Sequence, residues 1–195
     1  MLSNIKNLSL TKKLAYKIVF FIFCLIPFFS GLDSIPPLDR DESRFVQSTY
    51  QMIETNDYIN IKFLDEIRAK KPIGIYWAQS IFANIFGEDK ISSYRYVSTL
   101  GALITILVLW KFSQILFGQK ASLFVVSASM ISLLFIFESH VAKTDTLLLS
   151  LITLQQFLLL KIILNKEKSI FFDLIMPISM SVSYTHLTLP TTEAV

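Results

Sequence analysis

Two adjacent carboxylates, Asp41 and Glu42, follow the first apolar segment of the chain, and arginines at positions 40 and 44 flank them. Such a pair could supply a general base together with a positioning or metal-binding group. The neighbouring guanidinium groups would hold both carboxylates in the ionised form. An alternative stays open, because acidic residues here are also typical of a solvated helix start with Asp39 or Asp41 as N-cap.

A basic cluster further along the chain has the composition of a phosphate-binding site. Arg68, Lys70 and Lys71 precede Pro72, a residue that suits the first turn of a helix. Cations beside a helix start attract anions together with the free backbone N–H groups. Contact with anionic lipid headgroups, or simple solvation, is the alternative.

A third cluster consists of His140, Lys143, Thr144 and Asp145, between two apolar segments. A carboxylate that opens an apolar segment costs free energy unless it has a function or caps the helix, and both interpretations stay open for Asp145. His140 with acidic neighbours offers metal ligands, but one histidine among scattered acids does not identify a metal site. The metal therefore stays undetermined.

The composition places these clusters in a membrane protein. Of the 195 residues 53% are hydrophobic and 17% are charged, whereas about 25% are charged in soluble domains. Long apolar runs carry the excess, so the sequence predicts an all-α polytopic membrane protein. The single Cys24 excludes an intrachain disulfide. The net charge of +3, with lysines at segment ends, favours control of topology over nucleic-acid binding.

The apolar runs predict a transmembrane domain over residues 14–180, preceded by a basic start at 1–13. A cleaved signal peptide is the alternative for the first run. A loop too polar to span the bilayer, 33–93, follows that run. The predicted spans are 14–32, 94–117, 121–137 and 145–164, with a partial fifth span over 170–182.

The polar loop 33–93 is expected to have structure of its own. Apolar residues at helical spacing predict two helices that lie on the bilayer surface, over 42–54 and 72–86. Asn56 and Gly87 are typical residues after the end of a helix. Residues 58–63 alternate weakly between apolar and polar side chains, which favours a short extended piece.

The lysines indicate the orientation of the chain in the membrane. Lys6, Lys12 and Lys13 favour a cytoplasmic N-terminus. Alternation of the predicted spans then places 33–93 and 138–144 on the other side of the membrane. All three clusters of candidate residues are thus expected to face the same, non-cytoplasmic side.

The end of the chain does not continue the pattern. Pro177 interrupts the last apolar run, and a threonine-rich stretch replaces the expected span. Residues 183–192 resemble a translated adaptor sequence fused to a truncated reading frame. We therefore expect 181–195 to be a non-native tail and the chain to be a fragment of a longer protein.

The order of short motifs along the chain resembles a known family. The motifs are Leu38-Asp39-Arg40-Asp41-Glu42-Ser43-Arg44-Phe45, Met52-Ile53-Glu54-Thr55-Asn56-Asp57, Lys70-Lys71-Pro72-Ile73-Gly74-Ile75-Tyr76-Trp77, Phe86-Gly87, Tyr94-Arg95, Leu116-Phe117-Gly118 and Ala142-Lys143-Thr144-Asp145. Over roughly residues 14–170 the chain resembles the N-terminal part of the bacterial GT-C glycosyltransferases, the relatives of lipid A aminoarabinose transferases and protein O-mannosyltransferases.

This resemblance implies an enzyme of the bacterial inner membrane that transfers a sugar, with inversion, from a polyprenyl-phosphate donor. The acceptor would be lipid A, another glycan or a protein outside the cytoplasm. By matching position, Asp41 would be the general base, supported by Glu42. The groups implied for the donor phosphate are Lys71, Arg44 and Lys70. Those implied to complete or support the donor site are Arg95, His140, Lys143 and Asp145.

The chain departs from the family pattern at two positions. Phe45 stands where lipid A-type relatives often have tyrosine, and Lys70 stands where they have a glutamate before Lys-Pro. Acceptor identity and any divalent metal cofactor are therefore left open. Two other functions also stay open. One is a small transporter or channel subunit with His140 and Asp145 in its pathway, and the other is a non-catalytic assembly protein whose charged loop binds lipid or partners.

Overall fold

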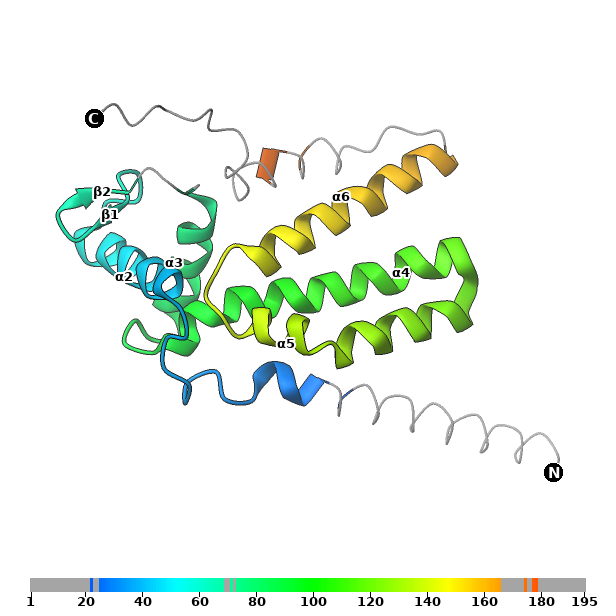
Figure 1. Ribbon diagram of the computed structural model, residues 1–195. Coiled ribbons are helices and arrows are strands. Elements are labelled where there is room, and N and C mark those ends of the chain that lie inside the picture. Colours follow the sequence, from blue (N-terminus) through cyan, green and yellow to red (C-terminus); the bar gives the residue numbers. More distant parts are fainter. Residues whose placement is uncertain are drawn as a thin grey trace, which may run out of the picture.

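Helices make up most of the computed structural model, which describes residues 22, 25–68, 71, 73–165, 174 and 177–178. The elements are α2 (Arg40–Thr55), β1 (Lys62–Phe63), β2 (Glu66–Ile67), α3 (Gly74–Phe86), α4 (Ile91–Ile131), α5 (Leu133–Ser139) and α6 (Asp145–Asn165). Helices α2 and α3 and the small hairpin gather at one end of the long helices α4 and α6 (Figure 1). The predicted helical class is thus confirmed at this coarse level.

Helix α4 reverses its direction at Gly118, where φ is 82° and ψ is 177°. The two arms of α4 then run back alongside each other (Figure 1). Glycine suits this place because a residue with a Cβ rarely adopts a positive φ. The arms correspond to the predicted spans 94–117 and 121–137. The second arm, however, breaks at Ser132, after which α5 takes up the rest of that predicted span.

Two helices in the described part of the chain are long and apolar enough to cross a membrane, Ile91–Ile131 and Asp145–Leu164. The criterion here is length and composition alone. Most of the predicted spans 14–32 and 170–182 lies outside the described residues, as do the basic start 1–13 and the tail 181–195.

Helix α2 begins where its sequence provides a cap. The carboxylate of Asp39 accepts a hydrogen bond from the backbone N–H of Asp41 over 3.3 Å, which satisfies one of the free donors of the first turn. The helix ends at Asn56, whose left-handed backbone has φ 53°. The prediction of a helix over 42–54 that stops at Asn56 is therefore confirmed.

Helix α3 lies close to its predicted range, and Gly87 (φ 110°) ends it by donating its N–H to the carbonyl of Ala83. Pro72, expected in its first turn, lies outside the described residues. Instead of one extended piece over 58–63, the chain forms a two-stranded antiparallel hairpin in which Lys62 faces Ile67. The weak alternation of apolar and polar residues over 58–63 predicted an extended segment where β1 lies but did not predict β2.

The core joins α2, α3 and α4. Phe45, Ile75, Tyr76 and Val97 belong to one buried cluster, and the rings of Phe45 and Tyr76 are 5.4 Å apart. A second cluster packs the segment before α2 against both arms of α4. It consists of Phe28, Ala102, Ile106, Val126 and Met130.

Helices α4 and α6 approach each other closely at Gly101. A Cβ built at this glycine would lie 2.8 Å from the carbonyl oxygen of Thr146 and 2.9 Å from the Cα of Leu147. Both atoms belong to the backbone of α6, so neither can move aside as a flexible side chain would. The absence of a side chain at this position therefore sets the distance between the two helices.

We expect Gly101→Ala to destabilise the protein, although glycine to alanine inside a helix is otherwise favourable by about 1 kcal/mol. The added methyl group would force the α4 and α6 backbones apart, and overpacking of this kind costs about 1–3 kcal/mol. Thermal unfolding in detergent, followed by circular dichroism, measures the change. The exposed Ala128→Val is the control and should change stability by no more than about 0.5 kcal/mol. A more stable Gly101→Ala protein would contradict the assigned contact.

Candidate functional site

A buried ion pair between Glu42 and Arg95 lies beneath the candidate site. Both side chains are 0% exposed, and the Nε of Arg95 donates to the Oε1 of Glu42 over 2.7 Å. The Nη2 of Arg95 reaches the other carboxylate oxygen over 3.2 Å. The guanidinium thus binds both oxygens of the carboxylate, and such a bidentate arrangement is the strongest geometry for an arginine–carboxylate pair.

The remaining hydrogen bonds of the pair tie separate segments to it. Arg95 donates to the backbone carbonyls of Leu32 and Ile35, each over 2.7 Å. Glu42 accepts from the backbone N–H of Leu38 over 2.8 Å and from that of Ala142 over 3.0 Å. The pair therefore joins the 32–38 segment, α2, α4 and the connection before α6. Glu42 has no oxygen left to act as a base on a bound molecule, and its place is that of a positioning group.

Polar side chains of α3 and α4 hold the connection 139–144 in place. The hydroxyl of Ser98 donates to the carbonyl of Val141 over 2.6 Å, and that of Thr99 to the carbonyl of Ser139 over 3.1 Å. Gln79 of α3 donates to the carbonyl of Ala142 over 3.3 Å. These contacts fix the connection that carries His140, Lys143 and Asp145. Sequence reasoning missed Gln79, Ser98 and Thr99, because isolated polar residues on apolar helices give no pattern of their own.

His140 is 7% exposed, and each nitrogen of its ring faces a backbone carbonyl. Nδ1 lies 2.7 Å from the oxygen of Ile136, and Nε2 lies 3.0 Å from that of Ser30. The ring thereby connects α5 to the segment before α2. Among the described residues, no group of three or more His, Cys, Asp or Glu side chains is arranged to hold a metal ion.

Exposed charged groups form the rim above this buried layer. Lys143 makes an ion pair with Asp39, which connects the start of α2 to the 139–144 connection. The hydrogen bond from Lys143 lowers the pKa of Asp39. Burial opposes the charge of Lys143, but its hydrogen bond to Asp39 and the nearby carboxylates raise its pKa overall.

Asp41 also lies on this rim. Its side chain is 47% exposed, and its Oδ1 lies 3.6 Å from Nη1 of Arg44. Burial raises the pKa of the Tyr76 hydroxyl, and the nearby negative charge of Asp41 acts in the same direction. The first turn of α2 therefore lies near the start of α3. Of the predicted carboxylate pair, Asp41 remains accessible while Glu42 is enclosed.

The basic cluster lies near the same end of α2. Nε of Arg68 donates to the hydroxyl of Tyr76 over 2.9 Å, and the guanidinium stands 5.5 Å from the ring centre of Phe45. Lys71 is half-buried and makes no ion pair with the described residues. Lys70 lies outside them. The aromatic ring of Phe45 therefore contacts a cation, the guanidinium of Arg68.

Glu138 is a candidate that sequence reasoning did not select. It lines a pocket of about 190 Å³ with Asp145 and Thr146, and its Oε2 is buried without a hydrogen-bond partner. Burial, followed by the charge of Asp145, raises the pKa of Glu138. An acidic residue directly after the apolar run 121–137 was the available signal. The structure thus brings Glu138, Lys143 and Asp145 together, with Arg95 and His140 behind them.

Comparison with known proteins identifies the family of the chain. Residues 70–189 match the sequence profile of the dolichyl-phosphate-mannose-protein mannosyltransferase family. The chain belongs to this family. The predicted resemblance to the N-terminal part of a GT-C glycosyltransferase is thereby confirmed. The match includes residues 181–189 of the tail, whose non-native origin stays a prediction.

Individual relatives of this mannosyltransferase-family chain are transferases of one kind. An undecaprenyl phosphate-α-4-amino-4-deoxy-L-arabinose arabinosyl transferase of Aeromonas hydrophila is 29% identical over 125 residues, which are 64% of the chain and 22% of the relative. The corresponding transferase of Aeromonas salmonicida is 28% identical over the same shares. The chain therefore spans about a fifth of the length of these curated relatives.

Two solved structures share the fold. ArnT from Cupriavidus metallidurans in the apo state superimposes with a TM-score of 0.75 at 16% identity, over 88% of the chain and 33% of ArnT. ArnT bound to undecaprenyl phosphate superimposes with a TM-score of 0.69 at 20% identity, over 73% of the chain and 26% of ArnT. This part of the mannosyltransferase-family chain thus has the fold of the corresponding part of ArnT.

We expect Glu42→Gln to destabilise the protein by about 3–5 kcal/mol, because it leaves the charge of Arg95 buried without its counter-ion. Chemical unfolding in detergent measures the difference in free energy. The adjacent Asp41→Asn is the matched control, since an exposed ion pair contributes only about 0–1 kcal/mol. Equal losses in the two variants would show that the buried pair is no stronger than an exposed one.

We expect Glu138→Gln to be more stable than the unchanged protein at pH 8 and nearly equal to it at pH 4. The folded-state pKa of Glu138 is raised, so the folded state holds this proton more tightly than the unfolded state does. The stabilisation that this tighter proton binding gives the folded state is fully present below the ordinary pKa of glutamate. It is lost as pH rises through the raised pKa of Glu138. Melting temperatures across this pH range measure the difference. The exposed Glu54→Gln should show none of this pH dependence, and a flat difference for Glu138→Gln would refute the assignment.

Proposed function

We propose that the protein containing this sequence is a membrane glycosyltransferase that moves a sugar from a polyprenyl-phosphate donor to an acceptor outside the cytoplasm. The observation that carries the proposal is an accessible carboxylate, Asp41, held beside cationic groups on a buried support of the ArnT fold. The names of the relatives, which specify undecaprenyl phosphate-linked aminoarabinose, favour a donor of this chemical class. The acceptor would be lipid A, another glycan or a protein.

In the proposed reaction, Asp41 is the general base. Its half-exposed carboxylate would accept the proton of the acceptor hydroxyl as the oxygen attacks the anomeric carbon of the sugar. The bond from that carbon to the donor phosphate breaks on the opposite face, so the configuration inverts. Glu42 takes no proton in this scheme and holds the first turn of α2 through Arg95.

The leaving group is a lipid phosphate whose negative charge grows as the bond breaks, and cations stabilise such charge. Lys71, Arg44 and Lys70 are proposed to bind this phosphate. Lys143 and Asp145 are proposed to complete the donor site, because they share the rim with Asp39 near the same end of α2. Arg95 and His140, both buried, would support the site from behind.

The proposed location is the bacterial inner membrane, with several spans, a cytoplasmic N-terminus and the 33–93 loop on the outer side. Helices α2 and α3 would lie along the bilayer surface, where a donor can keep its polyprenyl tail among the lipids. Two apolar helices of spanning length and the reversal at Gly118 support this arrangement.

We expect Asp41→Asn, introduced into the protein encoded by the complete reading frame, to lower the rate of sugar transfer about 10²- to 10⁴-fold. Transfer in membrane vesicles supplied with a polyprenyl-phosphate sugar measures the effect. Asp65→Asn, an exposed change in the hairpin turn, is the matched control and should leave transfer unchanged. Undiminished transfer by Asp41→Asn would remove Asp41 from its role as base.

We expect Lys71→Ala to lower the rate of transfer about 10²-fold, because a positioned cation would be lost from the departing phosphate. The exposed Lys62→Ala removes the same charge from the hairpin and should have no effect. Kinetics at varied donor concentration distinguish weaker donor binding, seen in KM, from a slower chemical step, seen in kcat. A loss shared equally by both variants would indicate a general effect of charge rather than a specific site.

A further inference from the structure

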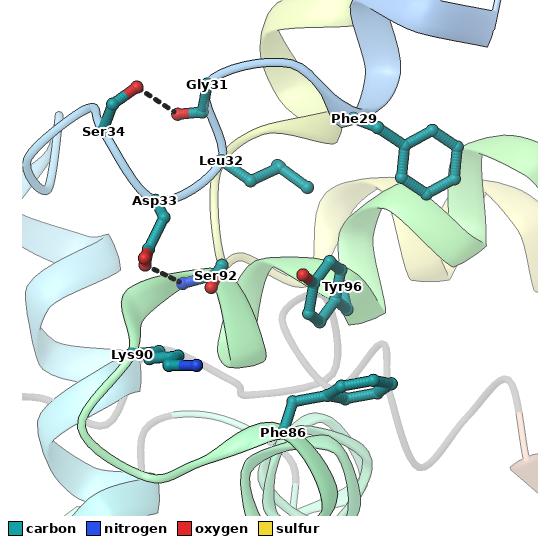
Figure 2. A pocket seen from close by; sticks show the side chains of 9 residues that line it. All are labelled: Phe29, Gly31, Leu32, Asp33, Ser34, Phe86, Lys90, Ser92 and Tyr96. Carbon is teal, nitrogen blue, oxygen red and sulfur yellow. Dashed lines mark hydrogen bonds between the residues drawn. The ribbon is translucent and has the colours of Figure 1, made fainter.

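A second pocket, of about 390 Å³, lies between the segment before α2, the end of α3 and the start of α4. Its volume is within the range of about 300–1,000 Å³ that is usual for ligand sites. None of the residues assigned above to the transfer site lines it. Figure 2 shows Phe29, Phe86 and Tyr96 along one side of the pocket, with Asp33 and Lys90 on the other.

One part of this pocket has the groups that bind a phosphate. Helix α4 begins next to Lys90, whose own side chain does not cap it. The carboxylate of Asp33 lies there instead and accepts from the backbone N–H of Ser92. The ammonium group of Lys90 forms no ion pair with the described residues and is turned toward the space below Ser92 in Figure 2. The hydroxyl of Tyr96 likewise has no hydrogen-bond partner in the described part of the chain.

Ser92 adds a further polar group to the pocket. The residue is only 5% exposed, yet its hydroxyl makes no hydrogen bond to any described residue and lines the pocket. Because this hydroxyl opens onto the pocket, it can form a hydrogen bond there to water or to a ligand. Its place in the first turn of α4 puts it beside Lys90, where it could donate to the same phosphate.

A carboxylate gives the pocket a second, opposite charge. Oδ1 of Asp33 accepts a long hydrogen bond, 3.4 Å, from the backbone N–H of Ser92. Asp33 and Lys90 make no ion pair with each other, so both charges remain available. Asp33 also borders an adjacent groove lined by Glu88 and Asp89. This acidic side favours a cation and disfavours a free phosphate dianion in the pocket as a whole.

The position of the pocket favours a lipid over a soluble ligand. It opens where the long apolar helix α4 begins, and the side chains of Phe29 and Phe86 at its edge are half exposed. In a membrane protein the end of a spanning helix lies at the level of the lipid headgroups, where amphipathic rings such as that of Tyr96 are enriched. Acyl chains of a lipid bound here would run along α4 into the hydrocarbon.

We propose that this pocket binds a zwitterionic phospholipid with a primary ammonium, such as phosphatidylethanolamine. The phosphate lies on the ammonium of Lys90 and the hydroxyls of Ser92 and Tyr96, and the ammonium of the lipid donates to Asp33. A quaternary ammonium has no N–H to donate, so phosphatidylcholine fits less well. The inference is independent of the transfer reaction, because it concerns binding at other residues.

The test is native mass spectrometry of the full chain released from detergent with equal amounts of phosphatidylethanolamine, phosphatidylglycerol and phosphatidylcholine. We expect phosphatidylethanolamine to be retained best. O-Phosphoethanolamine and inorganic phosphate are added in separate arms at millimolar concentration. If either soluble compound displaces the lipid, the occupant is a small anion or amine and the lipid proposal is overturned.

Two charge variants separate the halves of the site. Asp33→Asn should reduce retention of phosphatidylethanolamine about tenfold, the usual effect of losing a charged hydrogen bond, and leave phosphatidylglycerol unchanged. Lys90→Gln should weaken all three lipids. Asp65→Asn and Lys62→Gln, which make the same changes in the exposed hairpin, are the controls and should have no effect.

Tyr96→Phe serves as a further variant, since it removes one hydroxyl and keeps the ring. It should weaken the three lipids to a similar degree, and it keeps the proposal testable if Asp33→Asn loses its helical circular dichroism. Equal retention of the three lipids by the unchanged protein, or selectivity that survives in both charge variants, would overturn the proposal.

Discussion

The buried pair of Glu42 and Arg95 is the constraint on which the rest of the structure depends. Two opposite charges without solvent exposure are tolerated only when geometry and additional hydrogen bonds compensate for lost hydration. Here the compensation comes from backbone groups at Leu32, Ile35, Leu38 and Ala142. Because these groups belong to segments far apart in sequence, satisfying one ion pair requires the segments to meet. The hydrogen bonds that stabilise this ion pair thus bring four parts of the chain together, namely the 32–38 segment, α2, α4 and the connection before α6.

This arrangement separates enclosed charged groups from accessible ones. The enclosed groups, Glu42, Arg95 and His140, have their hydrogen-bonding capacity taken up by protein atoms. The groups on the rim, Asp41 and Lys143 among them, keep contact with solvent. A charged residue at the end of an apolar segment can belong to either layer. Burial, rather than residue type or proximity in sequence, decides between them.

The sequence predicted the helices of the 33–93 loop well, because Asp39, Asn56 and Gly87 are local signals that act within a few residues. The reversal at Gly118 lies between the predicted spans 94–117 and 121–137. The sequence could not show that Glu42 is buried while Asp41 is exposed, since that difference depends on Arg95, which lies 53 residues from Glu42. The pocket beside Lys90 was equally out of reach, because it is made by segments that meet only through the fold. Motif resemblance identified the family and implied different roles for Asp41 and Glu42, and the contacts show which of the two side chains is enclosed.

The close approach at Gly101 has a consequence beyond helix packing. The backbone atoms that a side chain there would strike belong to Thr146 and Leu147, directly after Asp145. Gly101 therefore acts as a spacer that sets how far the first turn of α6, with its carboxylate, stands from α4. Misplacement of a reacting group by about 1 Å can lower a rate about 10²-fold. The position of the Asp145 carboxylate relative to α4 is thus set partly by a residue that has no side chain.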